Sequence, residues 1–204
     1  ADAEIESPAA LREFLKPTAL LPTDGIVKTT ADQITRGHQG DLARARAIYA
    51  WVVEKTCRTA STRGCGVGDV RYMLTANDLN GKCADINSLF VALARAAGIP
   101  ARDAYGLRVA DSELGYKSLG KSGDVTKAQH CRAGFYAAGY GWVPVAPPAG
   151  ASAVGFFSVS LTTRPARSLN ARSRSLLASS VASSPRTSSK LRPVPGLTCF
   201  SCST

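Results

Sequence analysis

The chain has 204 residues, enough for one domain with a hydrophobic core and a short additional segment. No apolar run reaches the roughly eighteen residues of a membrane-spanning helix, so no transmembrane segment is expected. The formal net charge is +10, but +7 of it falls after residue 146, where no acidic side chain occurs. The remainder is only mildly basic, so we expect no specific nucleic-acid partner.

Helices are expected in the N-terminal third of the chain. Ser7 and Pro8 fit the N-cap and the first position of a short helix. Residues 17–30 are interpreted as a loop containing an Asp-Gly turn, after which Thr30 caps a brief helix that ends near Gly37.

A longer amphipathic helix is predicted from Asp41. Its apolar side chains recur at spacings of three and four, which places them on one face. This face comprises Leu42, Ala45, Ile48, Tyr49 and Val52.

The segment between this helix and residue 80 contains the glycine-rich run RGCGVGDV. It lacks the G-x-x-x-x-G-K-[ST] pattern of a phosphate-binding loop, so we interpret it as a flexible loop. A long loop that leads directly to a reactive cysteine is suited to line a substrate cleft. Cys57 and Cys65 in this segment are either free thiols or a disulfide pair.

The stretch from Gly81 to Arg102, GKCADINSLFVALARAAGIPAR, predicts a helix with Cys83 in its first turn. Apolar residues recur with helical spacing, and Gly98 and Pro100 mark its end. A thiol at a helix N-terminus lies near unpaired backbone N–H groups, which favour the thiolate. The thiolate is the nucleophilic form of cysteine.

Strands are predicted after Pro100. Residues 101–109 alternate, with Tyr105, Leu107 and Val109 on the side expected to be half-buried. A polar, glycine-rich connection covers residues 111–127. Residues 128–138 and 142–145 then form an antiparallel hairpin around the turn GYG.

A thiolate nucleophile needs a proton-transferring partner, and the chain has only His38 and His130. His38 falls in a predicted turn between two helices, and we interpret it as structural. His130 lies on the strand before the hairpin, far downstream of the cysteine helix. This arrangement favours His130 as the partner of Cys83.

The run GKCADINSLFVALARAAGIPAR resembles the nucleophile segment of the transglutaminase-like superfamily, and HCRAGFYAAGYGWVPV resembles its histidine strand and following hairpin. The resemblance covers residues 40–146. It implies an α+β fold with a papain-like core, in which a cysteine-bearing helix packs on an antiparallel sheet. The N-terminal helices are expected to belong to the same domain, residues 1–146, of bacterial type.

In that superfamily the nucleophile corresponds to Cys83 and the activating histidine to His130. The acidic third member follows a W-V-P-V motif, where this chain has Ala146. A glutamate of the family pattern is replaced by Gly134. Because the acidic residue orients the imidazole, its loss predicts impaired activity unless Asp85, Asp124 or a backbone carbonyl substitutes for it.

The resemblance implies acyl transfer. The Cys83 thiolate attacks a carboxamide or peptide carbonyl of a protein or peptide substrate, and backbone N–H groups at the helix start stabilise the oxyanion. Water or an amine then resolves the thioester, so the domain is a peptidase, an amidase or a protein-glutamine acyltransferase. No metal ion or organic cofactor is expected. An exported, periplasmic location in a bacterium is favoured over a cytoplasmic one.

Residues 147–204 form a low-complexity segment rich in Ser, Arg and Pro, for which we expect disorder. Cys199 and Cys202 have C-x-x-C spacing, but no second ligand pair accompanies them. The abrupt change after Val145 is also typical of a GC-rich gene read out of frame. A nucleic-acid-binding or membrane-surface arm is a weaker interpretation.

A different class of function is compatible with the same residues. A catalytically inactive domain would keep the cleft and bind peptide or cell-wall material without turning it over. Reactivity of Cys83 that depends on His130 would separate the enzyme from this binding domain.

Overall fold

The computed structural model describes residues 6–107, 109, 123–126 and 128–145. The predictions for residues 110–122, for Ala146 and for the tail lie outside these residues. The described part contains the helices α1 (Pro8–Glu13), α2 (Gly25–Thr35), α3 (Asp41–Lys55), α4 (Val70–Ala76) and α5 (Cys83–Ala96), and the strands β1 (Ala101–Leu107), β2 (Gln129–Ala137) and β3 (Gly141–Val145).

Local sequence signals explain where α1 and α3 begin. The Ser7 hydroxyl accepts a hydrogen bond from the Ala10 N–H (3.1 Å), which confirms the predicted cap of α1. Helix α3 begins at Asp41 and buries the predicted apolar face, including Ile48 and Val52. Its acidic first residue also suits the positive end of the helix dipole.

Two helical predictions were wrong. Helix α2 begins at Gly25 rather than near Thr30, because Asp24 and Gly25 form the N-terminus of a helix and not an isolated turn. Val27 and Ala31, four residues apart, then enter the core together.

Helix α4 lies inside the segment interpreted as a loop. Asp69 caps it by accepting a hydrogen bond from the Tyr72 N–H (3.0 Å). Asn77 ends it in the left-handed conformation. Both capping signals were present in the sequence, but the helix has only two buried side chains, Val70 and Met73, too few for a clear periodic pattern.

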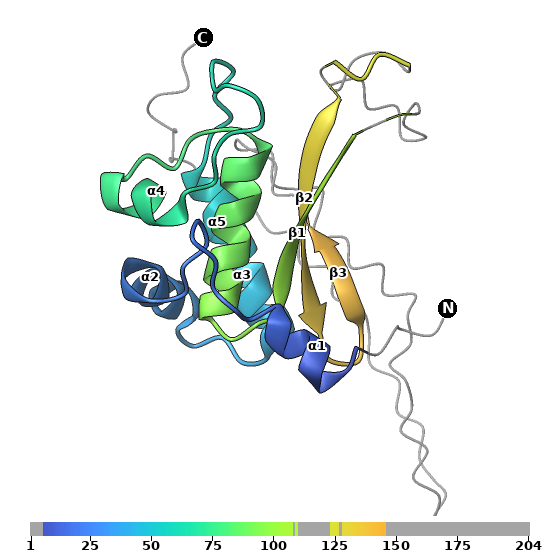
Figure 1. Ribbon diagram of the computed structural model, residues 1–204. Helices are drawn as coiled ribbons and strands as arrows, with labels where there is room; N and C mark the ends of the chain where they lie inside the picture. Colours follow the sequence, from blue (N-terminus) through green and yellow to red (C-terminus); the bar gives the residue numbers. More distant parts are fainter. Residues whose placement is uncertain (1–5, 108, 110–122, 127, 146–204) are drawn as a thin grey trace, which may run out of the picture. The chain divides into compact units, whose positions relative to one another are not determined.

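Helix α5 is the central element. It contacts α2, α3 and α4 as well as strands β1 and β2, so it is covered by helices on one side and by the sheet on the other (Figure 1). Phe90 at its middle is fully buried and faces Phe135 of β2 at 6.2 Å between ring centroids. This enclosure fixes the direction and depth of the residue at its N-terminus, Cys83.

The sheet is antiparallel with the order β1-β2-β3, which confirms the predicted hairpin and the α+β class. The predicted inward face of β1 was wrong, because Tyr105 is 63% exposed and Leu107 56% exposed. Ala101 is the buried residue of this strand. In Figure 1 the end of β1 reaches past the N-terminal end of α5, so its last residues are less covered than its first.

An aromatic cluster holds α1 against β3. The Trp142 ring lies 4.7 Å from the Phe14 ring, edge to face, and the Arg102 guanidinium lies 3.9 Å from the Trp142 ring centroid. The Trp142 indole N–H donates to Glu6 (2.9 Å). The N-terminal segment is therefore bound to the sheet by stacking, a cation–π contact and a hydrogen bond.

Among the described helices, none combines the length and the apolar character needed to cross a membrane.

Candidate active site

Three cysteines from separate segments converge at one end of the domain. Cys65 comes from the loop before α4, Cys83 is the first residue of α5, and Cys131 lies near the start of β2. Their sulfur atoms all lie within 4.8 Å of one another. The four cysteines that the structure describes form no disulfide, so a Cys57–Cys65 bridge is absent. We call Cys65, Cys83 and Cys131 the thiol cluster.

Asp85, in the first turn of α5, holds the loop that carries Cys65. Its carboxylate accepts hydrogen bonds from the backbone N–H groups of Val67, Gly68 and Lys82, each at 2.9 Å. The Cys65 carbonyl in turn accepts from the Ala84 N–H (2.8 Å). Three of these bonds join the loop to the helix N-terminus, and the Lys82 bond closes the first turn of α5, so Cys65 is held beside Cys83.

The glycines of the loop are needed for this close approach, so the loop is not the flexible connection expected from its composition. Gly66 and Gly68 both have positive φ values, 95° and 73°. A Cβ atom on Gly66 would collide with the Asp85 carboxylate, and one on Gly68 would lie 2.6 Å from the Ser88 hydroxyl oxygen. Only glycine satisfies both the backbone conformation and the space.

Asn87 links the helix to the histidine strand. Its side-chain N–H₂ donates to the carbonyls of Cys83 (2.7 Å) and Cys131 (3.2 Å). The side chain is 3% exposed, and its carbonyl oxygen has no hydrogen-bond partner among the described residues. The bond to Cys131 therefore links α5 to β2, and the unpaired carbonyl oxygen is buried at a cost in free energy.

Hydrogen bonds to Cys83 lower its pKa to about 3. The largest contribution is the hydrogen bond from the Cys131 thiol. The His130 side chain, the Cys131 backbone N–H and the Cys65 thiol add further hydrogen bonds in the same direction, while burial opposes them. Donors that converge on a sulfur atom favour its anionic form.

The pKa values of the other two thiols, Cys65 and Cys131, are raised. Burial, followed by the hydrogen bond to Cys83, raises the pKa of Cys65. The hydrogen bond to Cys83, followed by burial, raises the pKa of Cys131. One negative charge is thus held at Cys83 and stabilised by two neutral thiols.

Sequence reasoning predicted Cys83 and His130 as site residues and did not anticipate that Cys65 and Cys131 lie beside Cys83. The structure brings His130 to Cys83 through a side-chain hydrogen bond, whereas His38 is exposed in the connection between α2 and α3. The adjacency of Cys131 to His130 in the sequence was an available signal. Nothing local in the glycine-rich run indicates that Cys65 reaches the same place.

The third position of the expected triad, Ala146, lies outside the described residues, directly after the end of β3. Asp85 and Asp124 were the two acidic residues expected to be able to replace it. Both carboxylate oxygens of Asp85 accept hydrogen bonds from the three backbone N–H groups described above. Asp124 accepts a hydrogen bond from the Thr126 N–H (3.0 Å).

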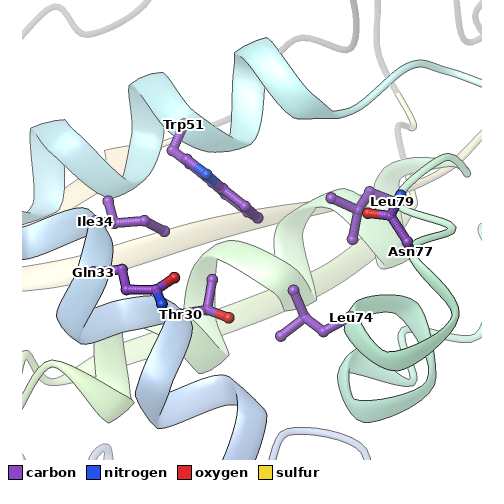
Figure 2. A pocket seen from close by; sticks show the side chains of 7 residues that line it. All are labelled: Thr30, Gln33, Ile34, Trp51, Leu74, Asn77 and Leu79. Atoms are coloured by element: carbon purple, nitrogen blue, oxygen red, sulfur yellow. The ribbon is translucent and has the colours of Figure 1, made fainter.

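A surface hollow of about 340 Å³ lies away from the thiol cluster, between α2, α3 and the α4 region. Figure 2 shows Trp51 reaching from α3 into this space, opposite Leu74 of α4. Its lining has no thiol, imidazole or carboxylate group: Thr30, Gln33, Ile34, Trp51, Leu74, Asn77 and Leu79. The hollow therefore lacks the thiol and imidazole groups expected for acyl transfer in this chain.

Three comparisons relate this arrangement to known proteins. The chain is 47% identical over 151 residues to an uncharacterized protein of Haemophilus influenzae, covering 70% of this chain and 41% of that protein. A putative cysteine protease from Cytophaga hutchinsonii has a similar fold, with a TM-score of 0.52 and 20% identity over 70% of this chain and 43% of the other.

The periplasmic domain of TgpA from Pseudomonas aeruginosa also has a similar fold, with a TM-score of 0.52 and 21% identity over 70% of this chain and 48% of that domain. The chain thus spans less than half the length of each of these three relatives. Residues 28–147 match the family model of the transglutaminase-like superfamily. This match covers more than half of the chain and includes the cysteine helix and the histidine strand, so the protein belongs to the transglutaminase-like superfamily.

Proposed function

We propose that this domain is a cysteine acyl-transfer enzyme in which Cys83 is the nucleophile and His130 the proton donor. The observation that supports the proposal is the lowered pKa of Cys83, caused mainly by the hydrogen bond from the Cys131 thiol and further by one from the His130 side chain. A thiolate beside an imidazole is the pairing that acyl transfer to sulfur requires.

The reaction would proceed in two halves. The Cys83 thiolate attacks the carbonyl carbon of a peptide or carboxamide and forms a tetrahedral oxyanion. As that intermediate collapses, the C–N bond breaks and His130 protonates the leaving amine. Water or a second amine then attacks the thioester, gives its proton to His130 and releases the thiolate.

The helix start limits which groups can stabilise the oxyanion. The Ala84 N–H donates to Cys65 and the Lys82 N–H to Asp85, so neither is available for a substrate. The Cys83 N–H has no partner among the described residues. We assign the Cys83 backbone N–H as the donor to the oxyanion.

The substrate class is a protein or peptide, and no nucleic acid, metal ion or organic cofactor takes part in the proposed reaction. Activity is impaired if Ala146 occupies the place of an orienting acid.

We also propose a periplasmic location, the compartment of the similar TgpA domain. Recovery of the protein only in the cytoplasmic fraction of its native host would exclude this location.

The proposal is tested by measuring hydrolysis and amine transfer on a set of peptide and glutamine-carboxamide substrates. Cys83→Ala should abolish turnover, and His130→Gln should reduce it by about 10²- to 10⁴-fold. His38→Gln is the matched control, because it removes the other histidine from an exposed connection, and it should leave turnover unchanged. Turnover that survives Cys83→Ala would refute the proposal. A chain with no turnover and no effect of His130→Gln on Cys83 alkylation would favour the peptide-binding alternative.

A further inference from the structure

The thiol cluster contains three thiol groups, whereas the proposed acyl transfer uses only one, that of Cys83. Cys65 and Cys131 lie beside the proposed nucleophile, and all three sulfur atoms lie within 4.8 Å of one another. In a tetrahedral zinc site with Zn–S bonds of about 2.3 Å, neighbouring sulfurs are roughly 3.8 Å apart. The three side chains are therefore within about 1 Å of the separation that one zinc ion would impose.

The backbone around the cluster is already fixed. Cys65 is held by its carbonyl bond to the Ala84 N–H (2.8 Å), and Cys131 lies in the β-ladder opposite Tyr105. Asn87 holds the carbonyls of both Cys83 and Cys131. Such hydrogen bonds behind the ligands are typical of metal sites, because they orient the ligating atoms before the ion arrives.

Charge and ligand type indicate which ion fits. Binding of Zn²⁺ displaces the protons of the Cys65 and Cys131 thiols into solvent. The resulting three thiolates around Zn²⁺ leave one net negative charge, and Lys82 lies close enough to act electrostatically on Cys65. Thiolate ligands select Zn²⁺ and other thiophilic cations over Mg²⁺ and Ca²⁺, which prefer oxygen. The cluster supplies three protein ligands, which leaves the fourth position of a tetrahedral site to a water molecule.

We propose that Cys65, Cys83 and Cys131 form a binding site for Zn²⁺. Because Cys83 is one of the three ligands, zinc and an acyl donor compete for the same sulfur, and the metal-bound domain is inactive. Only this inhibitory consequence rests on the proposed function. Metal binding itself rests on the geometry of the three thiols.

The test uses the full chain, reduced and freed of metal with a chelator, and titrated with Co²⁺ as a spectroscopic substitute for Zn²⁺. The expected result is a saturable thiolate-to-cobalt charge-transfer band, with one ion bound per chain, that Zn²⁺ displaces and Mg²⁺ does not. Cys65→Ser should weaken binding at least tenfold, an order-of-magnitude expectation for the loss of a ligand. Absence of a charge-transfer band would overturn the proposal, as would unchanged affinity in Cys65→Ser.

Two controls identify the thiols responsible. Cys57→Ser removes a cysteine from the same loop but outside the cluster, and it should bind Co²⁺ as the original chain does. The double variant Cys199→Ser, Cys202→Ser removes the C-x-x-C pair of the tail and should also retain binding. Loss of binding in the double variant would assign the metal to the tail and overturn the proposal.

A second measurement separates this inference from the proposed enzyme. Zn²⁺ should protect Cys83 from alkylation by iodoacetamide, and a chelator should restore the reaction. Neither cobalt binding nor protection depends on turnover. If the chain binds metal but shows no turnover, the proposed enzyme is refuted and the metal site stands. If the chain turns over substrate, binds no Co²⁺ and is insensitive to stoichiometric Zn²⁺, the metal site is refuted and the enzyme stands.

Discussion

The Asp85 carboxylate accepts a hydrogen bond from the backbone N–H of Gly68 at 2.9 Å, joining the N-terminal turn of α5 to a loop seventeen residues earlier in the chain. The same oxygen accepts from Val67, and the other oxygen accepts from Lys82. Asp85 is 8% exposed, so these bonds are made away from water. A single carboxylate thus holds both the loop that carries Cys65 and the helix start that carries Cys83.

Asp85→Asn should lower the free energy of unfolding by about 2 to 4 kcal/mol, because the amide N–H₂ replaces an acceptor that faces backbone donors. Urea unfolding measures the change. Asp69→Asn is the matched control, since Asp69 is an N-cap on the surface and asparagine caps helices about as well. Equal stability of the two variants would show that the loop does not depend on Asp85.

Alkylation of Cys83 should remain fast in acid. Its pKa is lowered to about 3, mainly by the hydrogen bond from the Cys131 thiol, so the thiolate persists far below the usual pKa of about 8.5. The rate constant with iodoacetamide, resolved by mass spectrometry of the Cys83 peptide, should stay level from neutral pH down to about pH 4 in the folded chain. The same chain unfolded in urea should show a rate that rises toward about pH 8.5, and an identical profile in both states would contradict the lowered pKa.

The lowered pKa of Cys83 makes the free energy of unfolding depend on pH. Because the folded pKa of Cys83 lies below its unfolded value, the unfolded chain binds the extra proton between about pH 3 and about pH 8.5. The contribution of Cys83 to stability is therefore complete above about pH 8.5 and is lost as the pH falls toward 3. Cys83→Ser should remove this part of the pH dependence of urea unfolding, and a variant with an unchanged profile would speak against it.

Ala146→Asp should increase turnover if residue 146 occupies the third position of the triad. The added carboxylate would orient the His130 ring and stabilise its charged form, an effect worth up to about 10⁴-fold in a serine protease. We expect a gain of at least about tenfold in kcat/KM, smaller because the Cys83 thiolate is already formed. Ala138→Asp, which adds the same charge in the exposed β2–β3 turn, should give no gain. Equal effects of the two substitutions would count against the assignment of position 146.

Trp142→Ala should lower the free energy of unfolding by about 3 kcal/mol, because it removes the ring that contacts Phe14 and Arg102. Trp142→Phe keeps an aromatic ring but loses the hydrogen bond to Glu6, so its cost should be about 1 kcal/mol. Thermal or urea unfolding distinguishes the two. If both variants cost the same, the hydrogen bond rather than stacking holds the N-terminal segment.

The sequence by itself determined the helix that begins at Cys83, the hairpin that follows His130 and the membership of both in one superfamily. These features depend on local signals, namely helical periodicity, Gly98 after the helix and the turn residues of the hairpin. Such signals lie within a few residues of one another, so a single chain segment contains them.

Only the tertiary structure decided what surrounds Cys83. Cys65 lies eighteen positions before Cys83 in the sequence, and Cys131 lies forty-eight positions after it. The three residues meet because α5 is enclosed by helices and sheet. In addition, Asp85 binds the loop of Cys65 and Asn87 binds the strand of Cys131. The run of glycines has the composition of a flexible loop, yet close contact with Asp85 and Ser88 requires it. Long-range packing fixed both results, and no local pattern encodes a contact between residues so far apart in the chain.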